Sequence, residues 1–175
     1  KSAVWGMVQS SFSGSQAMPR LQRLVRIDKA TNAVTMFGYD HVADPASLGS
    51  SHGGVKVGDM VAISDCELLV LEHDGANFAH VYRVRIVPGT STELTEVNGI
   101  TYEQGTTPYV PVEKTLVADL TQLLADLAVP TKPEGLVLVD PCTLALCFDN
   151  DYGHEGNELH VFAQPGLQAR NMMIT

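Results

Sequence analysis

The sequence has few positive charges, few cysteines and no long hydrophobic run. Its 11 Lys and Arg residues stand against 20 Asp and Glu residues, which gives a formal net charge of −9. A charge of this sign opposes binding to DNA, RNA or an anionic membrane surface. No apolar stretch approaches the roughly 18 residues of a membrane-spanning helix, and the first residues lack the apolar run of a signal peptide. We therefore expect neither a nucleic-acid partner nor a transmembrane segment.

The cysteines exclude two further kinds of small protein. Cys66, Cys142 and Cys147 are too few and too widely spaced for a disulfide framework or for a zinc site built from paired Cys-x-x-Cys motifs. We expect buried, apolar thiols. One bridge between Cys66 and Cys142 stays open as an alternative in an oxidising compartment.

What the sequence does contain is a series of short apolar runs. Hydrophobic residues make up 45% and charged residues 18% of the chain, so the chain can bury a core. The runs are β-branched or aliphatic and are bounded by Gly, Pro, Asn, Asp or Ser, which predicts an all-β fold. One leucine-rich stretch from Leu116 onward has helical spacing, and we expect a short inserted helix at residues 121–127. The predicted strands span residues 4–9, 21–27, 33–39, 59–64, 67–72, 80–87, 115–119, 135–139, 144–148 and 158–162.

An internal repeat organises these strands. Residues 56–71 align without a gap on residues 132–147, and each copy has two apolar strands around a turn that contains Asp and Cys. A small sheet repeated along a chain is typical of a β-propeller blade. We expect about two and a half blades at residues 1–45, 56–129 and 132–175, and because a propeller needs about 4 to 8 blades, the remaining blades would belong to a longer chain.

Acidic residues gather at the open end of the second repeat's hairpin. If Val139 pairs with Leu144, Glu134 faces Asp149 across that end, and Asn150 and Asp151 follow directly. Facing carboxylates repel each other unless something neutralises them. Side-chain oxygens are the ligands that calcium prefers, so we expect Glu134, Asp149, Asn150 and Asp151 to form a calcium site. The alternative is that these side chains are solvated strand ends or caps of neighbouring backbone.

The first repeat carries a similar acidic group. Pairing of Ile63 with Leu68 would set Asp59 opposite Glu72, with Asp74 close by. This pair is one residue nearer the turn, which in a regular pleat directs it to the opposite face. His73 and His154 each lie beside one of the two acidic ends, where a carboxylate would favour an imidazolium that suits phosphate binding.

Several of these segments, in this order, resemble the phytase-like family, known by the "esterase-like activity of phytase". The motifs are Glu-Leu-Leu-Val-Leu-Glu-His-Asp-Gly at residues 67–75, Ala-His-Val-Tyr-Arg-Val at 79–84, Lys-Thr-Leu-Val at 114–117, Pro-Glu-Gly-Leu at 133–136 and Phe-Asp-Asn-Asp-Tyr-Gly at 148–153. The resemblance implies a β-propeller of a secreted, periplasmic or envelope protein related to phosphoesterases. It also implies that the family's acidic and amide residues correspond to Glu134, Asp149, Asn150 and Asp151.

These features lead to one functional hypothesis and two alternatives. We expect a calcium-dependent phosphoesterase or phytase-like hydrolase acting on a phosphorylated small molecule, in which calcium would neutralise the phosphate and polarise a phosphoryl oxygen or a water. One alternative is a lactonase-like metal hydrolase. The other is a noncatalytic propeller that calcium stiffens for partner binding.

Overall fold

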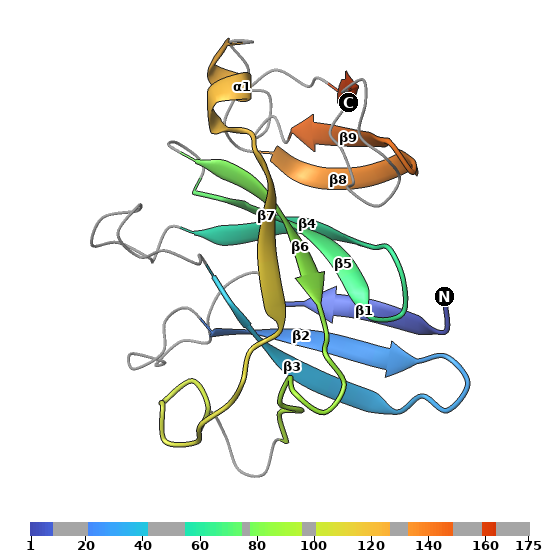
Figure 1. The fold of residues 1–175 in the computed structure, drawn as a ribbon, viewed down its shortest axis with the longest axis vertical. Coiled ribbons are helices and arrows are strands. Elements are labelled where there is room, and N and C mark those ends of the chain that lie inside the picture. Colours follow the sequence, from blue (N-terminus) through green and yellow to red (C-terminus); the bar gives the residue numbers. More distant parts are fainter. Residues whose placement is uncertain are drawn as a thin grey trace. The chain divides into compact units, whose positions relative to one another are not determined.

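The computed structural model describes residues 1–8, 21–41, 55–74, 78–95, 101–126, 133–148 and 159–163. These residues form three small sheets and one short helix (Figure 1). The sheets have the strand orders β1-β2-β3, β4-β5-β6-β7 and β10-β9-β8. The elements are β1 (Ala3–Met7), β2 (Leu21–Asp28), β3 (Val34–Asp40), β4 (Lys56–Ala62), β5 (Glu67–His73), β6 (Ala79–Arg85), β7 (Glu113–Asp119), α1 (Thr121–Asp126), β8 (Pro133–Asp140), β9 (Thr143–Phe148) and β10 (Leu159–Ala163).

The all-β prediction is confirmed, and each predicted strand overlaps an observed one. Each sheet is built from one of the three predicted groups of strands, and the two copies of the repeat form the hairpins β4–β5 and β8–β9. The closure of these sheets into a propeller stays a prediction.

Short polar side chains hold the tight turns between the strands. The Asp28 carboxylate accepts hydrogen bonds from the amides of Ala30 and Thr31, both at 3.0 Å, and Asn32 takes the left-handed conformation at φ 59°. Asn tolerates this conformation better than most residues. In the β8–β9 turn, Asp140 accepts the amide of Cys142 at 2.7 Å. Local side-chain chemistry therefore fixes both turns that the sequence predicts.

The chain divides into two compact units, which consist of residues 1–55, 62–67 and 84–114, and of residues 56–61, 68–83 and 115–175. In the first unit, Leu21, Leu94 and Tyr102 form a buried cluster against which Met36 and Tyr109 pack. A buried ion pair joins Arg23 to Glu103 in the same unit, with Nε to Oε1 at 2.5 Å and Nη2 to Oε2 at 2.9 Å.

In the second unit, the helix forms close to where the leucine spacing predicts it. α1 spans Thr121–Asp126, and Leu120 and Leu124 are buried as core residues. Leu116 does not share this helical face, because it lies in β7 with 49% of its surface exposed. Within the described ranges, no helix is long and apolar enough to cross a membrane.

The prediction of buried thiols is wrong. Cys66 and Cys147 are exposed, Cys142 is half-buried, and all three thiols are free. Each sits at a turn or on the outer side of a strand, where the hairpin geometry rather than residue hydropathy decides exposure.

Candidate functional site

The strand register around Glu134 differs from the predicted one. Leu138, not Val139, pairs with Leu144, and the register shifts again between Pro133 and Gly135. The ladder therefore skips Glu134, and Pro133 is the residue that pairs with Phe148 at the end of β9. Irregularities of this kind re-aim a side chain and occur often beside active sites. The predicted opposition of Glu134 and Asp149 depended on a regular ladder, which β8 does not have.

A glycine makes this irregular ladder possible. Gly135 pairs with Cys147, and a Cβ atom at position 135 would lie 2.1 Å from the Cys147 sulfur. No side chain fits at that distance, so the cysteine sulfur occupies the space directly over the glycine. The small residue after Glu134 thus lets β9 approach β8 closely at the point where Glu134 leaves the ladder.

Glu134 lies against a buried histidine of the other repeat. His73 Nε2 is 3.6 Å from Glu134 Oε1, and the two side chains are 1% and 24% exposed. Gly58 lies close to the same ring, because a Cβ atom there would be 3.1 Å from His73 Cδ2 and 2.6 Å from the carbonyl oxygen of Pro133. The structure therefore assembles a partly accessible carboxylate and a buried imidazole at the start of β8.

Asp59 and Asp74 both accept hydrogen bonds from backbone amides. Asp59 accepts the amides of Met60 at 2.7 Å and of Leu136 at 2.8 Å, one with each carboxylate oxygen. Asp74 accepts the amide of Phe78 at 3.0 Å. Both side chains therefore cap backbone groups. The β4–β5 hairpin closes through hydrogen bonds from the amides of Ile63 and Ser64 to the carbonyl of Glu67.

The predicted calcium ligands lie mostly outside the described residues. Asp149, Asn150 and Asp151 fall there, as does His154, which was expected beside them. Glu134 is the one predicted ligand that the structure describes, and the calcium site stays a prediction. Within the part of the chain that the structure describes, no group of three or more His, Cys, Asp and Glu residues is placed to hold a metal ion. The donor chemistry of the predicted set, carboxylate and amide oxygens, fits calcium.

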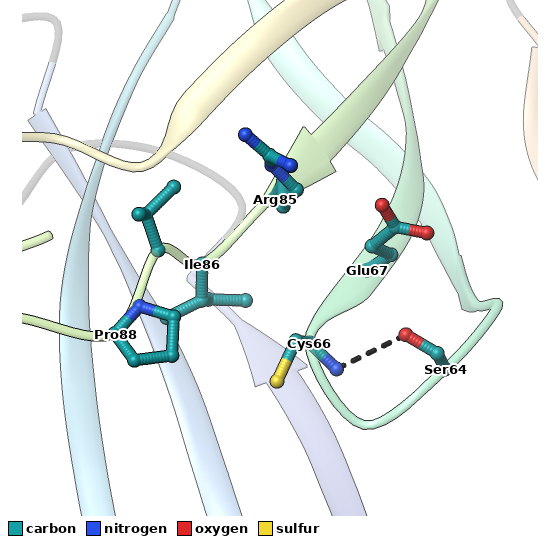
Figure 2. A pocket seen from close by; sticks show the side chains of 7 residues that line it. Ser64, Cys66, Glu67, Arg85, Ile86 and Pro88 are labelled. Atoms are coloured by element: carbon teal, nitrogen blue, oxygen red, sulfur yellow. Dashed lines mark hydrogen bonds between the residues drawn. The ribbon is translucent and has the colours of Figure 1, made fainter. Parts of the chain in front are cut away.

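The first unit contains a separate pocket that the sequence reasoning missed. It has a volume of about 300 Å³ and lies between the β4–β5 turn and the end of β6 (Figure 2). The Arg85 guanidinium beside it binds Glu113, with Nε and Nη2 at 2.9 and 2.6 Å from Oε2. The one cationic lining group is therefore already paired, and the pocket has no free positive charge to attract a phosphate. Its lining consists of Ser64, Cys66, Glu67, Arg85, Ile86, Val87 and Pro88.

The sequence patterns assigned His73 only a minor role beside an acidic strand end, although its position in the chain pointed to a site. In β5 a run of four buried aliphatic residues leads directly into Glu72 and His73, and both polar side chains are buried as well. Ionisable residues are rarely buried without a partner, so their position at the end of an apolar run was a usable sign of a site.

Comparison with protein families agrees with the resemblance found in the sequence. The family model described as "Phytase-like: Esterase-like activity of phytase" matches residues 1–152. No curated protein and no solved structure matches the chain.

Proposed function

The chain belongs to the phytase-like family, and on that premise we propose that it is a calcium-dependent hydrolase of phosphoric esters. The family's description by esterase-like activity indicates a hydrolase-like function in general terms. The phosphate substrate, the calcium ion and the residues that bind it are the specific content of the proposal. Extracellular, periplasmic or envelope location is part of the same proposal, by resemblance to the family.

The pairing of Glu134 with His73 is the observation that supports this proposal. Glu134 leaves the strand ladder, keeps 24% of its side chain exposed and lies 3.6 Å from a histidine that is itself buried. A carboxylate in this position is accessible to a ligand and has a buried imidazole as its neighbour. Both repeats contribute, since His73 ends the first hairpin and Glu134 begins the second.

Each residue has a distinct expected role. Glu134, with Asp149, Asn150 and Asp151, would supply oxygen ligands to calcium. The bound ion would neutralise phosphate charge and act as a Lewis acid. His73 lies beside the Glu134 carboxylate, and its protonated form would add positive charge next to an anionic substrate.

A calcium titration followed by thermal melting tests the binding step. We expect calcium to raise the melting temperature of the wild-type chain, because an ion that binds only the folded state stabilises it. The response should disappear in Glu134→Gln combined with Asp149→Asn. Glu113→Gln, which removes one carboxylate charge at an exposed position, should keep it. A wild-type melting temperature that does not change with calcium would remove calcium from the proposal.

Hydrolysis assays then separate the possible functions. We expect the wild-type chain to cleave a chromogenic phosphomonoester in calcium and to lose this activity with a chelator or in the Glu134→Gln variant. Cleavage of a lactone but not of the phosphomonoester would instead favour the lactonase-like alternative. Calcium-dependent stability without either activity, measured on the full-length protein, would favour the noncatalytic scaffold.

A further inference from the structure

A chain of polar contacts in the second unit links three residues that the proposed function does not use. His80 Nδ1 is 3.0 Å from the hydroxyl oxygen of Tyr82, and His80 Nε2 is 3.4 Å from Asp119 Oδ1. His80 and Tyr82 lie on the same face of β6, and Asp119 ends β7. Both ring nitrogens of one histidine thus have a defined neighbour.

Aromatic rings hold the histidine in this orientation. The Phe78 ring meets the His80 ring edge-on at 4.8 Å between centroids, and Tyr82 does so from the other side at 5.7 Å. Phe78 and Tyr82 are 5% and 4% exposed, whereas the His80 side chain is 20% exposed. The imidazole therefore keeps contact with solvent protons but has little freedom to turn.

The neighbours of His80 fix which nitrogen carries the proton. Asp119 is a carboxylate and can only accept, so the neutral ring places its hydrogen on Nε2. Nδ1 is then the acceptor for the Tyr82 hydroxyl. When a second proton binds at Nδ1, that nitrogen becomes a donor, so Tyr82 must accept and its hydroxyl hydrogen must turn elsewhere. Burial and, to a smaller extent, the charges of Glu72 and Asp119 raise the pKa of Tyr82. The Glu72 carboxylate therefore also acts on this hydroxyl.

Asp119 connects this histidine to the start of α1. Asp119 accepts the Thr121 amide at 2.9 Å, Thr121 Oγ1 accepts the Ala79 amide at 3.2 Å, and the Leu120 amide donates to the Ala79 carbonyl at 2.8 Å. The residue before His80 is therefore bonded to both residues that follow Asp119. Any change in the His80–Asp119 attraction acts directly on the contact between β6 and the beginning of α1.

We propose that His80 is a pH-dependent latch that fastens the start of α1 to β6 when its imidazole is protonated. Among the residues that the structure describes, the charged and titratable groups that face it are Asp119 from β7 and Tyr82 from β6, with Glu72 from β5 beyond the tyrosine; Phe78 and Thr121 are neutral. Protonation turns the contact with Asp119 from a neutral hydrogen bond into an ion pair, which is the stronger of the two. This inference does not depend on the proposed hydrolase function.

The sign of the pH effect follows from linkage. A carboxylate neighbour favours the imidazolium, so the folded chain should hold the His80 proton to a higher pH than the unfolded chain does. The added stability is fully present below the pH at which His80 is half protonated in the unfolded chain, about 6.5. It is lost as the pH rises through the corresponding midpoint of the folded chain. The latch is therefore closed in mildly acidic surroundings and weaker in alkaline ones.

Nitrogen-15 NMR of the imidazole rings tests the latch, with His80→Gln used to assign the His80 signals. At alkaline pH we expect the Nε2–H tautomer, and the His80 titration midpoint should shift downward in Asp119→Asn. Asparagine keeps the oxygen that caps Thr121, so this variant removes the charge while leaving the cap. Asp126→Asn, an exposed carboxylate on α1 bonded to Gln122, should leave the midpoint unchanged.

Amide exchange in the wild-type chain provides a second test that needs no variant. After correction for intrinsic rates, protection of the Ala79 and Leu120 amides should fall as the pH rises through the His80 midpoint. Protection of the Ile86 amide, which bonds Cys66 within the other unit, should not follow that midpoint. The proposal is overturned by an unchanged midpoint in a folded Asp119→Asn variant, by an Nδ1–H tautomer, or by pH-independent protection of Ala79 and Leu120.

Discussion

The buried ion pair between Arg23 and Glu103 makes a sharp prediction about stability. The Glu103 side chain is 0% exposed and the Arg23 side chain is 6% exposed, and two hydrogen bonds of 2.5 and 2.9 Å connect them. Glu103→Gln keeps the size of the side chain but leaves the guanidinium buried without its counter-charge. Removing one partner of a buried pair in this way costs about 3 to 5 kcal/mol, a large part of the total of about 5 to 15 kcal/mol for an ordinary domain.

The exposed pair Arg85–Glu113 is the matched control. Its shortest contact, 2.6 Å, is comparable, but both side chains are more than half exposed. Glu113→Gln should therefore cost no more than about 1 kcal/mol. Replacing both buried partners, as Arg23→Met with Glu103→Leu, should recover most of the loss, because neither charge of this pair then remains buried. Urea unfolding of the four chains measures these differences.

The same pair predicts how stability changes in acid. Burial tends to raise the pKa of Glu103, but the hydrogen bonds and charge of Arg23 outweigh it and hold that pKa below the ordinary value of 4.5. A carboxyl with a lowered pKa stabilises the fold fully above its unfolded pKa and stops doing so as the pH falls through the folded one. Glu103→Gln should thus lose less stability than the wild-type chain when the pH falls below about 4.5. If Glu103→Gln and Glu113→Gln lost equal free energies of unfolding in urea, the argument that burial makes the Arg23–Glu103 pair more important would be wrong.

Two further substitutions test contacts that position the strands. Asp59→Ala should lower stability by about 1 to 2 kcal/mol because the part-buried Leu136 amide loses its acceptor; thermal melting equal to wild type would contradict this role. Gly38→Ala should cost about 1 to 3 kcal/mol by overpacking, since its Cβ would lie 2.5 Å from the Tyr109 ring, which is also hydrogen-bonded to Asp40. Gly6→Ala, where a Cβ atom meets nothing within 4 Å, is the control, and equal melting temperatures for the two alanine variants would refute the packing argument.

The sequence was sufficient for most of the local structure. Strand positions follow from β-branched and aliphatic runs between turn residues, and Asp28 and Asp140 close the turns where their side chains predict them. The helix after Asp119 also forms as the leucine spacing indicates. Information of this kind is local, because it concerns residues that are neighbours in the chain.

The candidate site was predicted only in part. The sequence singled out Glu134, but it paired that residue across a regular hairpin, whereas the register shift between Pro133 and Gly135 takes it out of the ladder. It also assigned Asp59 to an acidic cluster, although Asp59 binds backbone amides. A shift of one residue reverses the face of a strand, so a small error in register changes which side chains are expected to face each other.

By itself, the sequence determined the all-β class, the repeated hairpin and the acidic character of the chain. Only the tertiary structure decided that Glu134 meets His73, that Arg23 is neutralised by Glu103, and that His80 lies between Tyr82 and Asp119. Except for the contact of His80 with Tyr82, these join residues distant in sequence. Their formation depends on strand register and on the burial of charge, because an ionisable group in a core needs a partner wherever in the chain that partner lies.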